Sequence, residues 1–272
     1  MRTFPMIGSV FVLSGLALAA DAPEPKSMHW MINGERRDAI VVVPDSPQGK
    51  PAPLVFVFHG HGSTMEAFAR KWDVHKHWPE AAAVYLQGLP TASHVDPKGK
   101  KAGWQSLAGT EGNRDLKFVD AVLETLRKSH TIDDDRIYAT GHSNGGGFTY
   151  VLWSARPKVF AAYAPCSANL HTPENKPLEP GPVLHIAGEN DETAPIENQL
   201  KTMARVREVN GCKANPVEWS GCKLYEPKAN SGAPFVSFIH PGGHGPPPRG
   251  FETIIQFFKE HPRHRSKPNV AD

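Results

Sequence analysis

A serine between two glycines is the first chemically informative feature of the sequence. Gly141 and Gly145 each lie two residues from Ser143, in a Gly-x-Ser-x-Gly pattern. An apolar, strand-like run (residues 136–140) precedes the pattern, and a helix-like run (residues 148–153) follows it. Strand, sharp turn and helix in this order are typical of a nucleophile elbow, which lifts a serine oxygen above the edge of a sheet. The pattern also arises by chance, so its significance depends on partners elsewhere in the chain.

An acid and a histidine follow two later apolar runs, where such partners would be expected. Asp191 comes shortly after the run 182–187, and His244 follows the run 234–240 in a glycine-rich turn. In open sheets the working residues lie beyond the carboxyl ends of the strands. The sequence therefore predicts that Ser143 is a nucleophile, that His244 is its general base and that Asp191 orients the imidazole.

The same chemistry needs an unambiguous acid and two backbone donors. Glu189 and Glu192 flank Asp191 and are rivals for its role. A tetrahedral intermediate carries an oxyanion that backbone N–H groups stabilise. We expect one such N–H from Asn144, directly after the serine. The other should come from His61, in the loop that follows the apolar run 54–58.

A long polar segment, residues 87–115, separates two predicted elements. Loops of this length in a compact domain are either functional or mobile. Trp104 stands in its middle, and we predict that this side chain binds substrate as an exposed wall. A tryptophan that pins the loop to the body of the protein is the alternative.

The three cysteines are predicted to differ in oxidation state. Cys212 and Cys222 lie in a segment rich in Pro, Gly and Asn. We expect them to form a disulfide, because the N-terminus predicts export into an oxidising compartment. Cys166 follows an apolar run and is expected to be a buried free thiol, with a catalytic cysteine as the alternative.

The histidines raise the question of a metal site. His59 with His61, and His75 with His77, form close pairs in the sequence. Neither pair has a carboxylate or cysteine at ligand spacing. We therefore predict no metal and no cofactor.

Composition and the N-terminus limit the remaining possibilities. The chain has 272 residues, of which 39% are apolar, and a net charge of +2. Without a basic stripe, the sequence predicts no nucleic-acid partner, and it leaves the oligomeric state undetermined. Residues 1–20 combine Arg2, a short apolar run and small residues near Ala19, which is typical of a signal peptide. We expect a secreted or periplasmic protein with no membrane span after signal removal; a transmembrane anchor is the alternative.

The elements that would position these residues alternate along the chain. The apolar runs 54–58, 81–86, 136–140, 159–164, 182–187 and 234–240 are nearly continuous, as in buried parallel strands, and helical patterns lie between them. Residues 29–44 form a hairpin around an Asn-Gly turn. The sequence predicts an α/β fold with a mostly parallel, doubly wound sheet and an antiparallel edge hairpin. Residues 21–272 are predicted to form a single domain, and residues 133–135 a turn with solvated charges.

The motifs, taken together, resemble a known group of enzymes. The relevant stretches are His59-Gly60, residues 113–119, residues 135–138, the serine motif 141–146, residues 160–165, Gly188-x-x-Asp191-x-x-x-Pro195 and Gly242-Gly243-His244. Together they resemble the polyhydroxybutyrate-depolymerase-like and feruloyl/acetyl-xylan esterase group of α/β-hydrolases, over roughly residues 53–258. The resemblance implies an α/β-hydrolase fold and hydrolysis of carboxylic esters, with Ser143, Asp191 and His244 at the triad positions.

Three departures from that group concern the substrate more than the reaction. His61 stands where the group often has a cysteine, and His142 where it often has a hydrophobic residue. Pro246 follows the histidine turn, where a tryptophan is common. We expect a secreted serine esterase that acts on feruloyl, acetyl or hydroxyalkanoate esters, small or polymeric. The alternatives are a serine peptidase of the same fold, which the lack of a propeller disfavours, and a non-catalytic binding protein that kept the fold.

Overall fold

A mixed β-sheet forms the centre of the protein. The computed structural model describes residues 23–44, 49–172 and 177–263, so the predicted signal segment lies outside it. Within these ranges ten strands pair in the order β1-β2-β4-β3-β7-β8-β9-β12-β11-β10. These strands are β1 (Lys26–Ile32), β2 (Glu35–Val42), β3 (Ala52–Phe58), β4 (Ala82–Leu86), β7 (Ile132–His142), β8 (Ala162–Cys166), β9 (Val183–Gly188), β10 (Val217–Trp219), β11 (Cys222–Tyr225) and β12 (Phe235–His240). Two further short strands, β5 (Leu89–Pro90) and β6 (Ala102–Gly103), pair with each other in a separate sheet.

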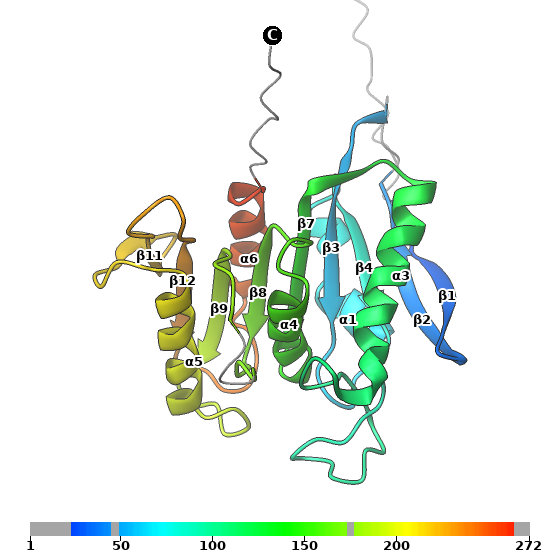
Figure 1. Cartoon of the computed structure of the whole chain (residues 1–272), viewed down its shortest axis with the longest axis horizontal. Coiled ribbons are helices and arrows are strands. Elements are labelled where there is room, and N and C mark those ends of the chain that lie inside the picture. The colour runs from blue at the N-terminus through cyan, green and yellow to red at the C-terminus, as the bar shows by residue number, and fades with distance from the viewer. Residues whose placement is uncertain (1–22, 45–48, 173–176, 264–272) are drawn as a thin grey trace, which may run out of the picture.

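Helices cover both faces of this sheet, as Figure 1 shows. They are α1 (Met65–Lys71), α2 (Val74–His77), α3 (Arg114–Ser129), α4 (Asn144–Ala155), α5 (Ile196–Val209) and α6 (Gly250–Glu260), with a 3-10 turn, η2 (Thr110–Asn113), before α3. Helices α3, α4 and α5 pack on one face, and α1, α2 and α6 on the other. The predicted doubly wound α/β fold is confirmed.

The central strands are parallel and buried on both sides. All seven residues of β3 are buried. Leu54 and Phe56 belong to the core beneath α3 and α4, whereas Val55 and Val57 belong to the core beneath α1 and α6. This alternation follows from the two-residue repeat of a strand. Because β3, β7, β8, β9 and β12 run in parallel, their carboxyl ends meet at one edge of the sheet.

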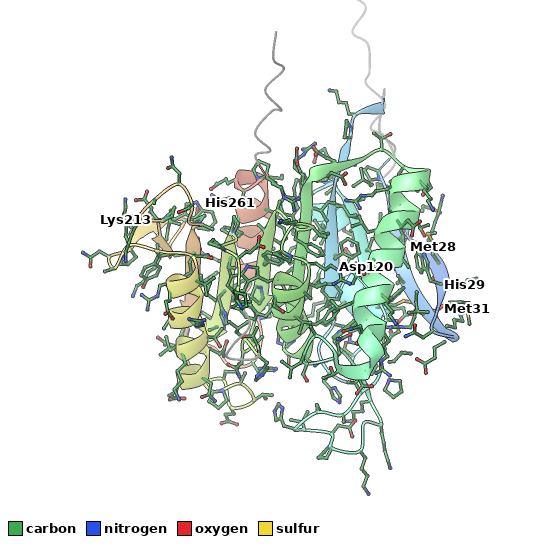
Figure 2. All side chains as sticks on the ribbon, in the orientation of Figure 1. Met28, His29, Met31, Asp120, Lys213 and His261 are labelled. Atoms are coloured by element: carbon green, nitrogen blue, oxygen red, sulfur yellow. The ribbon has the colours of Figure 1, made fainter. Side chains whose placement is uncertain are left out.

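Antiparallel hairpins form both edges of the sheet. The predicted hairpin around Asn33 is confirmed, with β1 at the edge and β2 paired to β4. The sequence did not predict the hairpin of β10 and β11 at the opposite edge. Figure 2 shows these two sides, with Met28 and Met31 on β1 at one end of the molecule and Lys213, before β10, at the other.

The prediction of a turn at residues 133–135 was wrong. These residues lie inside β7, and Asp133 forms an ion pair with Arg136 (2.6 Å). Thr64 caps α1 by accepting a hydrogen bond from the Ala67 N–H (3.2 Å). A backbone donor at the start of a helix needs such a partner.

The predicted disulfide between Cys212 and Cys222 does not form, because both thiols are free. Cys212 packs into the core beneath α5, and its thiol contacts the carbonyl oxygen of Ala233 (3.5 Å). Cys222 lies on β11 and packs into the core beneath α6. The two side chains therefore face opposite sides of the sheet, out of reach of the short Cβ–Cβ separation that a disulfide requires.

No helix in the described ranges has both the length and the apolar character needed to cross a bilayer.

Candidate active site

Ser143 occupies a strained turn between β7 and α4. Its backbone has φ 56° and ψ −120°, a region that residues with side chains rarely adopt. Its N–H donates to the carbonyl oxygen of Cys166 on β8 (2.8 Å), which holds the turn against the sheet. A side chain at Gly145 would overlap the carbonyl oxygen of Phe58. The glycines of the motif therefore allow helix and strand to approach closely and aim the serine outward.

The structure brings the three predicted side chains together from three separate loops. Oγ of Ser143, after β7, lies 2.8 Å from Nε2 of His244, after β12. Nδ1 of His244 lies 2.9 Å from each carboxylate oxygen of Asp191, after β9. The Asp191 side chain has no exposed surface. These contacts form one continuous hydrogen-bonded chain from an accessible hydroxyl to a buried carboxylate.

Asp191, rather than either neighbouring acid, occupies this position. Its Oδ1 accepts hydrogen bonds from the backbone N–H groups of Thr193 (2.9 Å) and Ala194 (2.7 Å). Its Oδ2 accepts one from the side-chain amide of Gln199 (3.2 Å). Glu189 and Glu192 are exposed. Three donors thus fix the orientation of the Asp191 carboxylate towards His244.

A buried polar network extends behind this carboxylate, and sequence reasoning missed it. Oε1 of Gln199, on α5, lies 3.0 Å from Nε2 of His185 on β9. Nδ1 of His185 lies 2.7 Å from the hydroxyl of Tyr150 on α4. Gln199 and His185 have no exposed surface. The signal available in the sequence was a histidine within the apolar run 182–187, since a buried polar group needs partners.

Stability should therefore depend on pH through His185. Burial lowers the pKa of His185 to about 4, from 6.5. Below pH 6.5 the unfolded chain takes up a proton that the folded protein excludes, so this stability is present above pH 6.5 and is lost towards pH 4. In urea unfolding, the free energy of unfolding of the wild type relative to His185→Gln should fall by up to about 1.4 kcal/mol for each unit that the pH is lowered from 6.5 towards 4. A difference that stays constant across this range would contradict the proton linkage.

The two segments from which oxyanion donors are predicted both lie beside Ser143. Asn144 is the first residue of α4, and the first N–H groups of a helix have no partner within the helix. On the other side, a Cβ built on Gly60 would lie 3.5 Å from Cβ of Ser143. The segment that carries His61 therefore lies against Ser143, and His61 lines the same pocket as Ser143.

The predicted role of Trp104 as an exposed substrate wall is wrong. Its side chain is completely buried, and it stacks on Phe148 with ring centroids 5.4 Å apart. Its indole N–H donates to the carbonyl oxygen of His59 (2.8 Å). Truncating a buried tryptophan typically costs about 3–5 kcal/mol. Trp104 thus pins loop 87–115 to the body of the protein, which was the alternative prediction.

The side chain of Asn144 connects this loop to the nucleophile. Oδ1 of Asn144 accepts from the Trp104 backbone N–H (2.6 Å), and Nδ2 donates to the Trp104 carbonyl (3.1 Å). A Cβ built on Gly103 would lie 2.6 Å from the His61 ring and 2.9 Å from Oδ1 of Asn144. Only glycine leaves room for this packing. Loop 87–115 therefore contacts both segments from which oxyanion donors are predicted.

A buried ion pair holds the base of the same loop. Nη2 of Arg37 lies 2.7 Å from Oδ1 of Asp115, and both side chains are fully buried. Oδ2 of Asp115 accepts from the backbone N–H of Gln105 (2.7 Å), and Arg37 also donates to the carbonyl of Gln87 (3.2 Å). Removing one partner of such a pair typically costs about 3–5 kcal/mol. The start and the end of loop 87–115 are therefore fixed to β2.

Ser143 opens into a pocket of about 230 Å³. One wall is the tip of loop 87–115, around His94 and Val95, and another is the segment after β8, around Asn169 and His171. His244 and the Asp191 loop complete the pocket. This size suits a small acyl or phenyl group rather than a folded polypeptide.

A second histidine packs against His244. The His142 ring centroid lies 4.7 Å from that of His244. Burial, and then the nearby His244, lower the pKa of His142 to about 4. A neutral imidazole thus lies beside His244 at neutral pH, and it adds no positive charge to the site.

The remaining candidate residues have structural explanations. Nε2 of His59 accepts from the Gly88 N–H (2.9 Å), and His75 is hydrogen-bonded to the hydroxyl of Tyr85 (3.0 Å). No group of three metal-binding side chains occurs in the part of the chain that the structure describes. Burial raises the pKa of the Cys166 thiol to about 12. A thiol that stays protonated is a poor nucleophile, so Cys166 is a core residue.

Comparison with known proteins adds independent information. The chain is 31% identical over 230 residues to feruloyl esterase C of Emericella nidulans, a match that covers 82% of this chain and 81% of that protein. It is 29% identical over 271 residues to a probable feruloyl esterase C of Aspergillus niger, covering 92% and 96% of the two chains. The solved acetyl xylan esterase from Aspergillus awamori superposes with a TM-score of 0.63 at 12% identity, over 86% of this chain and 99% of that chain. The sequence profile of the prolyl oligopeptidase family matches residues 98–172.

Proposed function

Because the chain belongs to the feruloyl esterase family of α/β-hydrolases and is a serine carboxylic ester hydrolase, we propose that it cleaves feruloyl esters through Ser143, His244 and Asp191. The observation that carries this proposal is the continuous hydrogen-bonded chain of these three side chains at the pocket. Three loops distant in sequence would not converge in this order by packing alone. The similarity to feruloyl esterases supports the choice of acyl group.

The geometry supports a two-step acyl transfer. Oγ of Ser143 attacks the ester carbonyl carbon while Nε2 of His244, 2.8 Å away, takes the hydroxyl proton. The resulting oxyanion is stabilised by the backbone N–H groups of Asn144 and His61. The intermediate collapses, the carbon–oxygen bond to the alcohol breaks, and His244 protonates the departing oxygen.

A water molecule then completes the reaction. His244 removes a proton from this water, which attacks the acyl-enzyme carbonyl and forms a second oxyanion. Collapse breaks the bond to Oγ of Ser143, returns the proton to that oxygen and releases ferulate. Asp191 stabilises the charged imidazole in both steps and holds Nδ1–H towards itself, so that Nε2 faces the serine.

A serine peptidase is the second candidate, because the prolyl oligopeptidase profile matches residues 98–172, which include the elbow. The pocket of about 230 Å³ and the esterase relatives favour an ester over a peptide substrate. Peptide bonds also have a poorer leaving group than alcohol esters. A peptidase activity should therefore be at most a minor one.

A substrate panel tests the proposed acyl group. We expect the protein to release ferulate from methyl ferulate, measured by chromatography, with a kcat/KM that exceeds its kcat/KM for acetylated xylan and for poly-hydroxybutyrate. It should release no p-nitroaniline from peptidyl p-nitroanilides. Hydrolysis of acetylated xylan or the polyester without cleavage of methyl ferulate would assign a different acyl group.

Export belongs to the proposal too, on the strength of the predicted signal in residues 1–20. N-terminal sequencing of the protein recovered outside the cytoplasm tests this. A first residue of Ala20 or Asp21 would match cleavage after the small residues of the signal, and an intact N-terminus would contradict it.

A further inference from the structure

A second pocket adjoins the active-site pocket. It has a volume of about 580 Å³ and lies between the segment after β8 and helix α5. Asn169 and His171 line both pockets. The two pockets therefore lie next to each other, around the same two side chains.

Two cationic side chains line this second pocket. Lys201 and Arg205 lie one helical turn apart on α5, so they share a face of the helix. Arg205 pairs with Glu208 (2.7 Å), which offsets part of its charge, and no ion pair within the described ranges engages Lys201. The other lining groups are amides, hydroxyls, one leucine and His171, whose pKa is lowered by burial. Among the described residues, the lining of this pocket thus has a net positive charge and no carboxylate.

The position of this pocket indicates which part of a substrate would enter it. Thr193 and Ala194, in the Asp191 loop, line the active-site pocket, and α5 begins two residues later at Ile196. Helix α5, which lines the second pocket, therefore continues directly from the Asp191 loop, and Asp191 in turn contacts His244. Because His244 must reach the departing oxygen to protonate it, the alcohol part of the ester lies on this side.

We propose that the second pocket binds a carboxylate carried on the alcohol part of the ester, such as a uronic or quinic acid unit. This inference rests on the proposed esterase function and specifies its substrate class. Lys201 supplies an ammonium that pairs with no carboxylate in the described ranges, and Arg205 supplies guanidinium donors that match a carboxylate. Because both side chains are exposed, the attraction should be modest and sensitive to salt.

A matched pair of substrates isolates the charge. The ferulate ester of quinic acid carries a carboxylate, and its methyl ester has the same acyl group and nearly the same size without the charge. At low salt we expect the wild type to favour the acid about threefold to tenfold in kcat/KM, mainly through KM. The double variant Lys201→Gln, Arg205→Gln should lose this preference, and about 0.5 M NaCl should weaken it in the wild type.

The control variant is Lys128→Gln. Lys128 is an exposed lysine on α3, which α4 separates from α5 (Figure 1), so its replacement removes one positive charge outside the pocket. This variant should keep the preference for the acid. A preference that is absent in the wild type, or that survives in the double variant, overturns the inference.

Methyl ferulate separates this inference from the proposed function. If the wild type does not cleave methyl ferulate, the feruloyl esterase proposal fails. If it cleaves methyl ferulate but treats the acid and its methyl ester alike, only the carboxylate pocket is refuted.

Discussion

Replacing Ser143 with alanine is expected to lower kcat for methyl ferulate about 10⁶-fold. The substitution removes Oγ, which lies 2.8 Å from Nε2 of His244, and no other hydroxyl is hydrogen-bonded to that nitrogen in the described structure. The substitution leaves the rest of the pocket lining in place, so KM should change little. Release of ferulate, followed by chromatography over hours, gives the required sensitivity.

Ser154→Ala provides the matched control. Ser154 lies on α4, the helix that begins directly after Ser143. Its hydroxyl donates to the carbonyl of Val151 (2.9 Å), away from the pocket. This variant should retain wild-type turnover. A fluorophosphonate probe should label the wild type and Ser154→Ala, but not Ser143→Ala, as mass spectrometry would detect. Turnover by Ser143→Ala above about a hundredth of the wild-type rate would exclude Ser143 as the nucleophile.

Asp191→Asn should be the second most damaging substitution, with a loss of about 10⁴-fold in kcat. Both Asp191 oxygens lie 2.9 Å from Nδ1 of His244, so the carboxylate selects the tautomer with a proton on Nδ1. An asparagine can present an N–H to Nδ1 and favour the other tautomer, in which Nε2 carries the proton. Nε2 then cannot accept the proton of Ser143.

The neighbouring acids are natural controls for this experiment. Glu189→Gln and Glu192→Gln remove exposed carboxylates next to Asp191 and should change kcat less than twofold. Thermal unfolding should show that Asp191→Asn still folds, since the side-chain oxygen of asparagine can accept from the N–H groups of Thr193 and Ala194. A large loss of kcat in either glutamate variant, with activity retained in Asp191→Asn, would show that Asp191 is not the acid that orients His244.

Much of the fold was predictable from continuous apolar runs. Strands such as β3 and β9 are buried on both faces, so nearly every residue in them is apolar. The hairpin of β10 and β11 was missed because its strands have only three and four residues, too few for their alternation of apolar and polar residues to stand out. The three acids at residues 133–135 were read as a turn because charges are rare in buried strands, yet this end of β7 is only partly buried.

The residues of the candidate site also include some that could be predicted from the sequence and some that could not. Ser143, Asp191 and His244 were predictable because each follows an apolar run, and parallel strands bring such positions to one edge. Gln199, His185 and the side chain of Asn144 were not, because their roles depend on contacts between segments far apart in the chain. The resemblance to feruloyl and acetyl-xylan esterases, and with it the enzyme class, is confirmed by the relatives.

The disulfide prediction failed for a related reason. Cys212 and Cys222 are close in sequence, but sequence separation does not reveal which face of a sheet a side chain occupies. The strand β11 turns Cys222 towards one core, while Cys212 stays in the other. The prediction that Trp104 is an exposed substrate wall was wrong for a similar reason. The sequence does not show whether an aromatic residue in a polar loop points outward or anchors the loop.

The anchoring of loop 87–115 bears on how such enzymes diversify. Residues 92–99 form its tip, between Thr91 and Lys101, which are joined by a backbone hydrogen bond (3.1 Å). Below that bond, the contacts of Trp104 and Asp115 fix the base of the loop. Lengthening a loop between fixed ends costs little, about 0.6 kcal/mol for each doubling. Within the tip, only the Asp96 carboxylate, 3.3 Å from Nε2 of His61, is tied by a side-chain hydrogen bond to a predicted site residue in the described structure. Changes in the tip that spare Asp96 can thus alter substrate choice during evolution while the predicted catalytic residues stay in place.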